Sequence, residues 1–378
     1  MSKKILISVN TAWNLFNFRS GLIQALISLG YEVVAVAPKD DYSEGLELLG
    51  CRFVNIEIDN KGTNFQRDFL LLCRYIRLLI KEKPSICLFY TVKPNIYGSL
   101  ASMFCKIPYL NNVSGLGAVF IKGGWLEKFI SILYRLAFIK SSKVFFQNNE
   151  DLQLFSEKKI VKPNMVDILP GSGINLSKFK PLTANLNSDE NNAFYFLLIA
   201  RMLKDKGVIE YVNAAQILKA SGFNVKCCLL GFLDVQNPAA INSTQMGNFV
   251  EQGFVHYLGK SDDVREHISR ADCVVLPSYR EGTPRSLLEA AAMAKPIITT
   301  NVIGCKNVVD DGVNGFLCEP KNAIDLAMKM KAMILLSNDE RQIMGRNGRL
   351  KVEKEFDESI VIQKYLEIID IKLKSRSV

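Results

Sequence analysis

Two carboxylates, Glu281 and Glu289, lie on either side of a predicted helix start. They belong to the segment 277–289, which reads PSYREGTPRSLLE. Glu281 falls in the loop before the helix, and Glu289 lies roughly 7–8 Å along the helix at about 1.5 Å per residue. Carboxylates so placed could bind a polyol, with one accepting from a sugar hydroxyl and the other from a ribose diol.

The same segment offers a helix N-terminus that could hold an anion. The preceding run 271–277, ADCVVLP, is apolar and β-branched, as in a buried parallel strand. Thr283 is a favourable N-cap and Pro284 suits the first helical position, so a helix is expected from Pro284 to about residue 294. Its first N–H groups would face a diphosphate. The residues of this binding element are Gly282, Thr283, Pro284, Arg285 and Ser286. Strand, loop and Pro-started helix are also ordinary α/β structure, so a purely structural role stays open.

A second predicted strand leads to two cations. Segment 194–207, FYFLLIARMLKDKG, reads as a buried strand followed by a loop that carries Arg201 and Lys206. In doubly wound sheets, ligands collect at the carboxyl ends of strands, where this loop would lie. Arginine offers a bidentate fork and lysine a mobile point charge, so the two could clamp a diphosphate. A solvated loop of charge is the alternative.

Taken in order, these segments resemble the donor half of family 4 glycosyltransferases. The hallmark of that family is a Glu, seven residues and a second Glu, which Glu281 and Glu289 match, and DGVNG at 311–315 follows in the expected place. The resemblance covers about residues 194–330. It implies the GT-B fold, in which two Rossmann-like α/β domains face a cleft, and a retaining reaction.

The resemblance also implies roles for the matched residues. Arg201, Lys206 and the helix N-terminus would stabilise the departing diphosphate, Glu281 would orient sugar hydroxyls, and Glu289 would hold the ribose. The donor would be a UDP-linked hexose or N-acetylhexosamine, with no metal or other cofactor. The acceptor would be a polyprenyl-diphosphate saccharide in bacterial surface glycan or protein glycan assembly. A GT-B nucleotide-sugar epimerase and a non-catalytic nucleotide-sugar-binding partner are the alternatives.

The first half of the chain matches the family less closely. Arg19 ends the segment 10–19 after the first strand and is the candidate substitute for the glycine pair that many relatives have there. Lys93 follows a later strand and could contact an acceptor phosphate. Ser114 and Gly115 belong to NNVSGLG, 111–117, which resembles the loop that approaches donor and acceptor. The histidine of many relatives is missing. A surface arginine at a helix start and a solvated lysine are the alternatives.

Charge is concentrated in this first half. The whole chain has a net charge of +9, and residues 1–180 hold 23 basic against 14 acidic residues. Such a domain could face nucleic acid, anionic lipid or an acidic substrate. Nucleic acid is not expected, because no recognition helix, zinc finger or RNA-binding aromatic motif occurs.

One predicted helix, 124–140, mixes cations with large apolar residues. Its first face is apolar: Leu126, Phe129, Ile130, Leu133, Leu136 and Ala137. Its second stripe is mixed and suits the interface of an anionic membrane: Trp125, Lys128, Ile132, Arg135 and Ile139. A core helix with solvated cations is the alternative.

Length and periodicity predict two domains and a closing helix. The 378 residues exceed one typical core. We expect an acceptor domain at 1–180, a donor domain at 181–357 with a linker at 181–192, and a helix at 358–378 that crosses back. In the first domain, strands near 4–9, 32–37, 52–57, 85–90, 108–112, 142–147 and 165–169 should alternate with helices near 18–29, 66–82, 95–105, 124–140 and 149–156.

Other site classes are not expected. The nine cysteines form no CxxC pair and mostly fall in apolar segments, so they read as core residues. The two histidines lack metal-ligand spacing. No apolar run reaches the ~20 residues of a membrane span, and no signal peptide is visible. The protein should act in the cytoplasm, on the inner face of the membrane.

Overall fold

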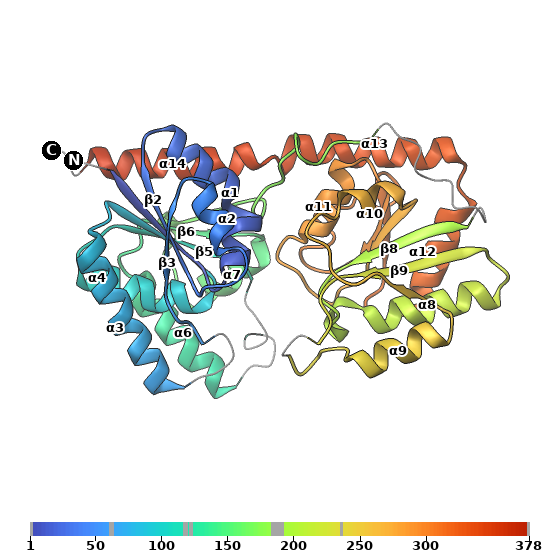
Figure 1. Cartoon of the computed structure of the whole chain (residues 1–378), viewed down its shortest axis with the longest axis horizontal. Coiled ribbons are helices and arrows are strands. Elements are labelled where there is room, and N and C mark those ends of the chain that lie inside the picture. Colours follow the sequence, from blue (N-terminus) through green and yellow to red (C-terminus); the bar gives the residue numbers. More distant parts are fainter. Residues whose placement is uncertain are drawn as a thin grey trace. The chain divides into compact units, whose positions relative to one another are not determined.

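The structure is a computed structural model that describes residues 3–59, 64–115, 120, 124–182, 193–234 and 237–375. It divides into two compact units, which Figure 1 shows. Unit 1 comprises residues 1–172 and 358–378, and unit 2 comprises residues 173–357. The division thus falls before residue 180, and most of the expected linker 181–192 lies outside the described residues.

Unit 1 is built on a parallel sheet of seven strands in the order β3-β2-β1-β4-β5-β6-β7. The α/β class predicted from the sequence is therefore confirmed. The strand bounds lie within one or two residues of the expected ones: β1 (Lys4–Ser8), β2 (Glu32–Ala37), β3 (Arg52–Asn55), β4 (Ile86–Tyr90), β5 (Tyr109–Val113), β6 (Lys143–Phe146) and β7 (Val166–Ile168).

The helices of unit 1 cover both faces of this sheet. They are α1 (Ala12–Ser28), α2 (Ser43–Leu48), α3 (Phe65–Glu82), the π-helix η1 (Pro94–Gly98), α4 (Ser99–Phe104), α6 (Trp125–Phe138), α7 (Asn149–Glu157), the 3₁₀ turn η2 (Pro163–Met165) and α14 (Glu358–Lys374). Alternate strand residues enter different cores, since Ile5 and Ile7 pack with α1 and α14, whereas Leu6 packs with α3.

Helix α1 begins earlier than the sequence interpretation places it. The expected start near residue 18 is wrong, because Thr11 accepts a hydrogen bond from the backbone N–H of Asn14 at 3.1 Å and caps the helix there. Arg19 therefore lies inside a helix and is buried. The C-terminal helix α14 packs in the core of unit 1 through Val361, Tyr365 and Ile369.

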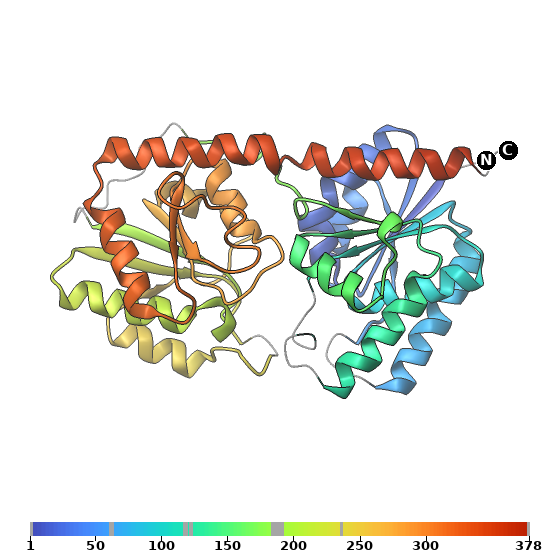
Figure 2. The ribbon, with the colours of Figure 1, turned by 180° about the vertical axis from the view of Figure 1, so that it is seen from behind.

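Unit 2 has a second parallel sheet, in the order β10-β9-β8-β11-β12-β13. Its strands are β8 (Phe194–Ile199), β9 (Val225–Leu230), β10 (His256–Tyr257), β11 (Cys273–Leu276), β12 (Ile297–Thr300) and β13 (Gly315–Cys318). Its helices are the 3₁₀ turn η3 (Lys204–Lys206), α8 (Val208–Ala220), α9 (Ser243–Glu251), α10 (Arg265–Arg270), α11 (Arg285–Ala292), α12 (Ala323–Leu335) and α13 (Asn338–Glu355). One core packs against α8, α9 and α12, and the other against α10, α11 and α13 (Figure 2).

Each sheet has one point where the strand order reverses. In unit 1 it lies between β1 and β4, and in unit 2 between β8 and β11. The connections that leave such neighbouring strands run to opposite faces, which opens a crevice at their carboxyl ends. The candidate residues of each unit are therefore best considered at these two points.

Candidate functional site

Two loops meet at the switch point of unit 2. The loop after β8 carries Lys206, the loop after β11 carries Glu281, and Lys206 Nζ lies 2.5 Å from Glu281 Oε1. Both side chains are largely buried, with 16% and 15% of their surface exposed. The structure thus brings together one cation and one carboxylate that the sequence interpretation places in separate segments.

Backbone contacts hold these loops against each other. The backbone N–H of Tyr279 donates to the carbonyl of Asp205 at 2.9 Å, and the Ser278 hydroxyl donates to the same carbonyl at 3.1 Å. Gly207 has φ +74°, and a Cβ there would lie 2.1 Å from the carbonyl oxygen of Pro277. Only glycine permits both that φ and that approach. Lys206 is therefore fixed beside the loop of Glu281.

A third loop completes the same edge of the sheet. The N–H of Glu281 donates to the carbonyl of Ile303 at 3.1 Å. Gly304, at φ +85°, brings its Cα so close that a Cβ would lie 2.5 Å from the Glu281 carbonyl oxygen. The position of the Glu281 backbone is thus set by the loops after β8, β11 and β12.

The second carboxylate, Glu289, lies inside helix α11 and is paired there. Arg285 Nε donates to Glu289 Oε1 at 2.9 Å, an i,i+4 contact within the helix. Burial raises the pKa of Glu289 above its usual value, and the charge of Arg285 partly opposes that shift. The structure does not join Glu289 to Glu281 by any contact among the described residues.

The start of α11 differs in detail from the expected one. The helix begins at Arg285, with Pro284 as the N-cap in an extended conformation and no side chain capping it. The expectation of Thr283 as N-cap is therefore wrong, because the extended ψ of Pro284 delays the first helical residue by one. The helix ends at Ala292, two residues before the expected end, and Ala294 has φ +55°.

The remaining residues predicted for unit 2 lie in the loops after β8 and β11 and at the start of α11. Gly282 and Ser286 are half-buried in the loop and first turn of α11. Arg201 is exposed, and no hydrogen bond or ion pair joins it to Glu281 or Glu289 in the described part of the chain. Arg201, in the loop after β8, and Ser286, in the first turn of α11, thus take no part in the ion pair of Lys206 and Glu281.

In unit 1, the buried arginine stacks on an aromatic ring. Arg19 Cζ lies 4.2 Å from the centroid of Tyr90, at the end of β4, and Nη1 donates to the carbonyl of Phe18 at 3.2 Å. Its Nε has no hydrogen-bond partner among the described residues, although only 5% of the residue is exposed. A surface arginine, the alternative for Arg19, is thereby excluded. Burial also raises the pKa of Tyr90, with Arg19 opposing.

A buried polar network lies at the adjacent strand ends. The Asn112 amide donates to Tyr365 Oη at 3.0 Å, and the Ser114 hydroxyl donates to Asn112 Oδ1 at 3.0 Å. Gly115 has φ +141° with open space where a Cβ would lie. Of the resembling loop 111–117, residues 116–117 lie outside the described ranges. Ser114 is thus connected through Asn112 to α14.

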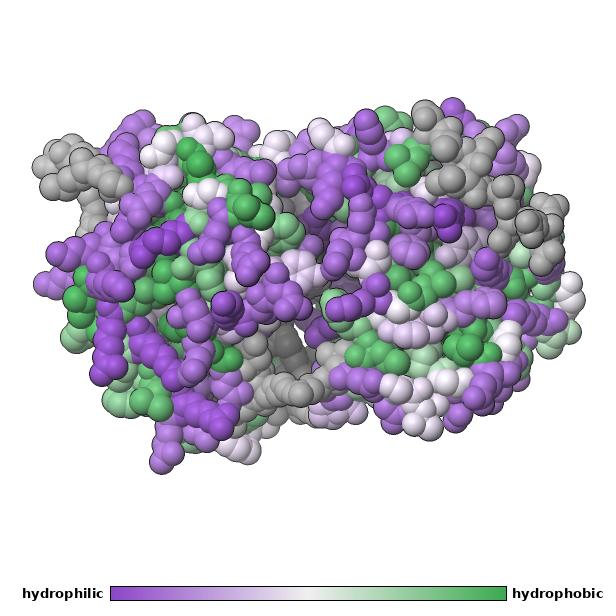
Figure 3. All heavy atoms as spheres, in the orientation of Figure 1, coloured by the Kyte–Doolittle hydropathy of each residue, from purple (hydrophilic) through white to green (hydrophobic). Residues whose placement is uncertain are grey.

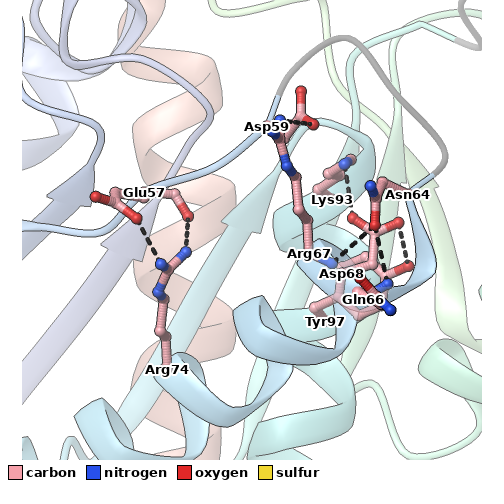
Figure 4. Close-up of polar contacts among 9 residues, drawn as sticks. All are labelled: Glu57, Asp59, Asn64, Gln66, Arg67, Asp68, Arg74, Lys93 and Tyr97. Carbon is pink, nitrogen blue, oxygen red and sulfur yellow. Dashed lines mark hydrogen bonds and ion pairs between the residues drawn. The ribbon is translucent and has the colours of Figure 1, made fainter.

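Lys93 is paired and is not a solvated lysine. Its Nζ lies 2.6 Å from Asp68 Oδ1 on α3, and Tyr97 Oη donates to Asp68 Oδ2 at 3.0 Å (Figure 4). All three side chains come from elements on one side of the sheet. Lys93 therefore carries a charge that Asp68 already balances.

Sequence reasoning missed two features of unit 1. Thr91 has φ +62°, which is unusual for a β-branched residue and marks local strain right after β4. Asn111 donates to Asn95 Oδ1 at 3.0 Å and to Ser99 Oγ at 2.7 Å inside the core. The available signal was the asparagine pair at 111–112, since asparagine is depleted in strands.

The described residues hold neither a membrane span nor a metal cluster. None of the described helices has the length and apolar character needed to cross a membrane. Nowhere in the described ranges do three His, Cys, Asp or Glu side chains gather as metal ligands do. All nine cysteines are free, and most are buried.

Two units, each built on a parallel α/β sheet with its own switch point, define a protein of the GT-B fold class, and comparison gives its family. Residues 183–351 match the family model "Glycosyl transferases group 1", and residues 4–148 match "Glycosyl transferase 4-like". A glycosyltransferase structure from Rickettsia africae has the same fold, with a TM-score of 0.79, 20% identity and 99% coverage of both chains.

Two curated relatives align over most of the chain. The N,N'-diacetylbacillosaminyl-diphospho-undecaprenol alpha-1,3-N-acetylgalactosaminyltransferase of Campylobacter jejuni is 31% identical, over 96% of this chain and 97% of the relative. The UDP-Gal:alpha-D-GlcNAc-diphosphoundecaprenol alpha-1,3-galactosyltransferase of Escherichia coli is 25% identical, over 77% and 76%. The chain therefore belongs to the group 1 glycosyl transferases, and the predicted membership of family 4 is confirmed. It is a glycosyltransferase.

Proposed function

We propose that this glycosyltransferase moves a hexose or an N-acetylhexosamine from a UDP-sugar to a saccharide linked to polyprenyl diphosphate, with retention at the anomeric carbon. The observation that carries the proposal is the pair formed by Lys206 and Glu281 at the switch point of unit 2. The substrate classes are supported by the two relatives, whose names give diphospho-undecaprenol saccharides as acceptors.

The donor diphosphate would bind the cations of unit 2. Lys206 lies beside Glu281, and Arg201 is exposed in the same loop. The N–H groups of Arg285 and Ser286 at the start of α11 would add hydrogen bonds and the positive end of the helix dipole. Gly282 gives the loop room for the sugar, and Glu281 would accept hydrogen bonds from its hydroxyls. Glu289 would hold the ribose.

Catalysis would come from electrostatic stabilisation of the leaving group. The bond between the anomeric carbon and the UDP oxygen breaks, and negative charge grows on the departing diphosphate. Lys206 and Arg201 would stabilise that charge with no metal or other cofactor. An acceptor hydroxyl then bonds to the anomeric carbon from the same face, and its proton passes to the departing phosphate.

Unit 1 would hold the acceptor. Arg19 is a buried cation whose Nε has no hydrogen-bond partner in the described part of the chain, and such a group favours an anionic partner, here a phosphate of the acceptor. Lys93, whose charge Asp68 balances, would contact an acceptor phosphate as a hydrogen-bond donor, while Ser114 and Gly115 would contact the sugars. The acceptor's lipid places the reaction at an anionic membrane, and we infer the inner face of the cytoplasmic membrane, with no nucleic-acid partner.

The test is a panel of UDP-sugars assayed for UDP release, with and without polyprenyl-diphosphate saccharides. Release that needs acceptor, with one sugar, supports the proposal, and NMR of the product gives the anomeric configuration. UDP binding without release would favour the non-catalytic partner. Conversion of the UDP-sugar in the absence of acceptor, to an epimer, would favour the epimerase.

A further inference from the structure

Two amphipathic helices of unit 1, α3 and α6, lie side by side in both views of the chain (Figures 1 and 2). Phe65 at the start of α3 meets Phe129 in the first turn of α6 edge to face, with ring centroids 5.4 Å apart. Their solvent-facing sides therefore adjoin. We call these sides together the α3–α6 face.

The part contributed by α3 has an apolar stripe beside a basic one. The apolar stripe has helical spacing and includes Phe69, which is 64% exposed: Phe65, Phe69 and Ile80. Ile76 lies in the same stripe but is half-buried against the core. The basic stripe follows the same helix a third of a turn away: Arg67, Arg74, Arg77 and Lys81. At the lower left of Figure 3, over α3, hydrophobic and hydrophilic side chains lie next to each other.

The part contributed by α6 repeats this arrangement. Trp125 is 71% exposed, and three further apolar residues share its side of the helix: Ile132, Leu136 and Ile139. Leu136, which the sequence analysis groups with the first apolar face, is 44% exposed. Lys128 and Arg135 flank the apolar residues. Large exposed apolar side chains gathered on one surface mark an interaction site.

The acidic residues of both helices are already paired. Asp68 binds Lys93, and Glu127 binds Lys158 at 2.7 Å. Glu82 is buried against Lys4 and Arg52.

The cations of the face divide into paired and unpaired ones. Figure 4 shows Arg67 with Asp59 and Arg74 with Glu57. The remaining four have no carboxylate partner among the described residues: Arg77, Lys81, Lys128 and Arg135. Of these, Arg135 donates from Nη2 to the carbonyl of Lys158 at 2.7 Å. The α3–α6 face is thus apolar and positively charged.

We propose that the α3–α6 face binds an anionic lipid bilayer. Its exposed apolar residues would enter the headgroup boundary, with Trp125 at the interface, and its cations without a carboxylate partner would contact lipid phosphates. The occupant follows from charge complementarity, because a bilayer offers both an apolar layer and a plane of negative charge. The biological role of this membrane binding rests on the proposed function, because the proposed lipid-linked acceptor lies in such a bilayer.

The first experiment is sedimentation of the full chain with vesicles of phosphatidylcholine, with and without 30 mol% phosphatidylglycerol. We expect binding to the anionic vesicles only. The double variant Phe69→Ser, Trp125→Ser should bind anionic vesicles at least about tenfold more weakly than the wild type. The double variant Arg77→Gln, Lys128→Gln should bind roughly 25-fold more weakly, at about fivefold per cation.

Matched controls lie in unit 2, where Ile324 and Leu350 are exposed to 67% and 62%. Serine at both of those positions, and Lys354→Gln, should leave vesicle binding unchanged. Equal binding by the wild type and the α3–α6 variants would overturn the proposal, as would equal binding to neutral vesicles.

A second experiment observes the face directly. The chain has two tryptophans, so Trp13→Phe leaves Trp125 as the single indole. Anionic vesicles should shift its emission to shorter wavelength, and brominated lipids should quench it. An unchanged spectrum would contradict insertion.

Transfer to a short-chain, water-soluble acceptor separates the two proposals. The α3–α6 variants should retain that activity while losing vesicle binding. If the wild type binds vesicles but transfers no sugar to any acceptor, the proposed function fails and the membrane surface stands.

Discussion

Lys206 and Glu281 are 75 residues apart in the chain, yet they form an ion pair of 2.5 Å at the carboxyl ends of neighbouring strands β8 and β11. Burying this ion pair costs free energy because each charge loses its hydration, and good geometry between the two charges must offset that cost. This pair keeps a positive and a negative group together at the point where doubly wound sheets bind ligands. We expect Lys206 to bind the diphosphate of the donor and Glu281 to bind its sugar hydroxyls.

Alanine at Glu281, Lys206 or Arg201 should each lower sugar transfer by about a hundredfold or more, because each removes a charge from the proposed donor site. UDP release with the best donor and acceptor measures the effect, and circular dichroism checks the fold. Near-normal activity of all three folded variants would overturn the assignment.

The exposed pair of Glu266 and Arg270 in unit 2 supplies the control. It also joins oxygen and nitrogen at 2.5 Å, but its side chains are more than half exposed. Alanine at both positions should leave transfer unchanged, since exposed pairs contribute little.

Gly207→Ala should lower the free energy of unfolding of unit 2 by more than about 2 kcal/mol, from the left-handed φ and the clash with Pro277. Gly253 is the matched control, because it has nearly the same φ, +73°, and open space for 4 Å around the position that a Cβ would take. Gly253→Ala should cost only about 1 kcal/mol. Urea unfolding measures both. Equal losses would show that the close approach is unimportant.

Glu289→Gln should change the pH dependence of stability. The ordinary pKa of a glutamate is 4.5, and burial raises that of Glu289, with Arg285 opposing. As the pH rises from 4.5 to the raised pKa of the folded chain, Glu289 loses its proton in the unfolded chain first, so the wild type loses stability. The Tm of the variant should therefore rise relative to the wild type as the pH is raised above 4.5.

The control for that experiment is Glu353→Gln, which removes a half-exposed carboxylate from another i,i+4 pair, with Arg349. Its Tm difference gives the general effect of losing one charge. A Glu289→Gln variant that weakens relative to the wild type with rising pH would show that Arg285 outweighs burial.

Arg19→Met should separate function from stability. A buried guanidinium with an unpartnered Nε contributes little to folding, so the free energy of unfolding should stay equal or rise by about 1–2 kcal/mol. Transfer should fall about tenfold or more if Arg19 binds an acceptor phosphate. In contrast, Arg52→Met leaves the buried Glu82 with Lys4 alone and should destabilise the chain. A large loss of stability in Arg19→Met would assign Arg19 a structural role.

Much of the fold was predictable because the strands are buried on both faces. A run such as ILI, residues 5–7 of β1, is apolar and fully buried, so the strand type follows from composition. Helix starts were harder to predict. Thr11 and Thr283 look alike as caps, but only Thr11 accepts a backbone hydrogen bond, because Pro284 is extended.

The sequence by itself determined the two α/β units and the order of the motifs that carry Arg201, Lys206, Glu281 and Glu289, since these depend on local periodicity and spacing. Tertiary structure alone decided which charges meet. Strand β8 pairs with β11 in the sheet although β9 and β10 lie between them in the chain, and that neighbour choice joins Lys206 to Glu281. It also buried Arg19 against Tyr90, because packing between distant segments sets desolvation and charge partners.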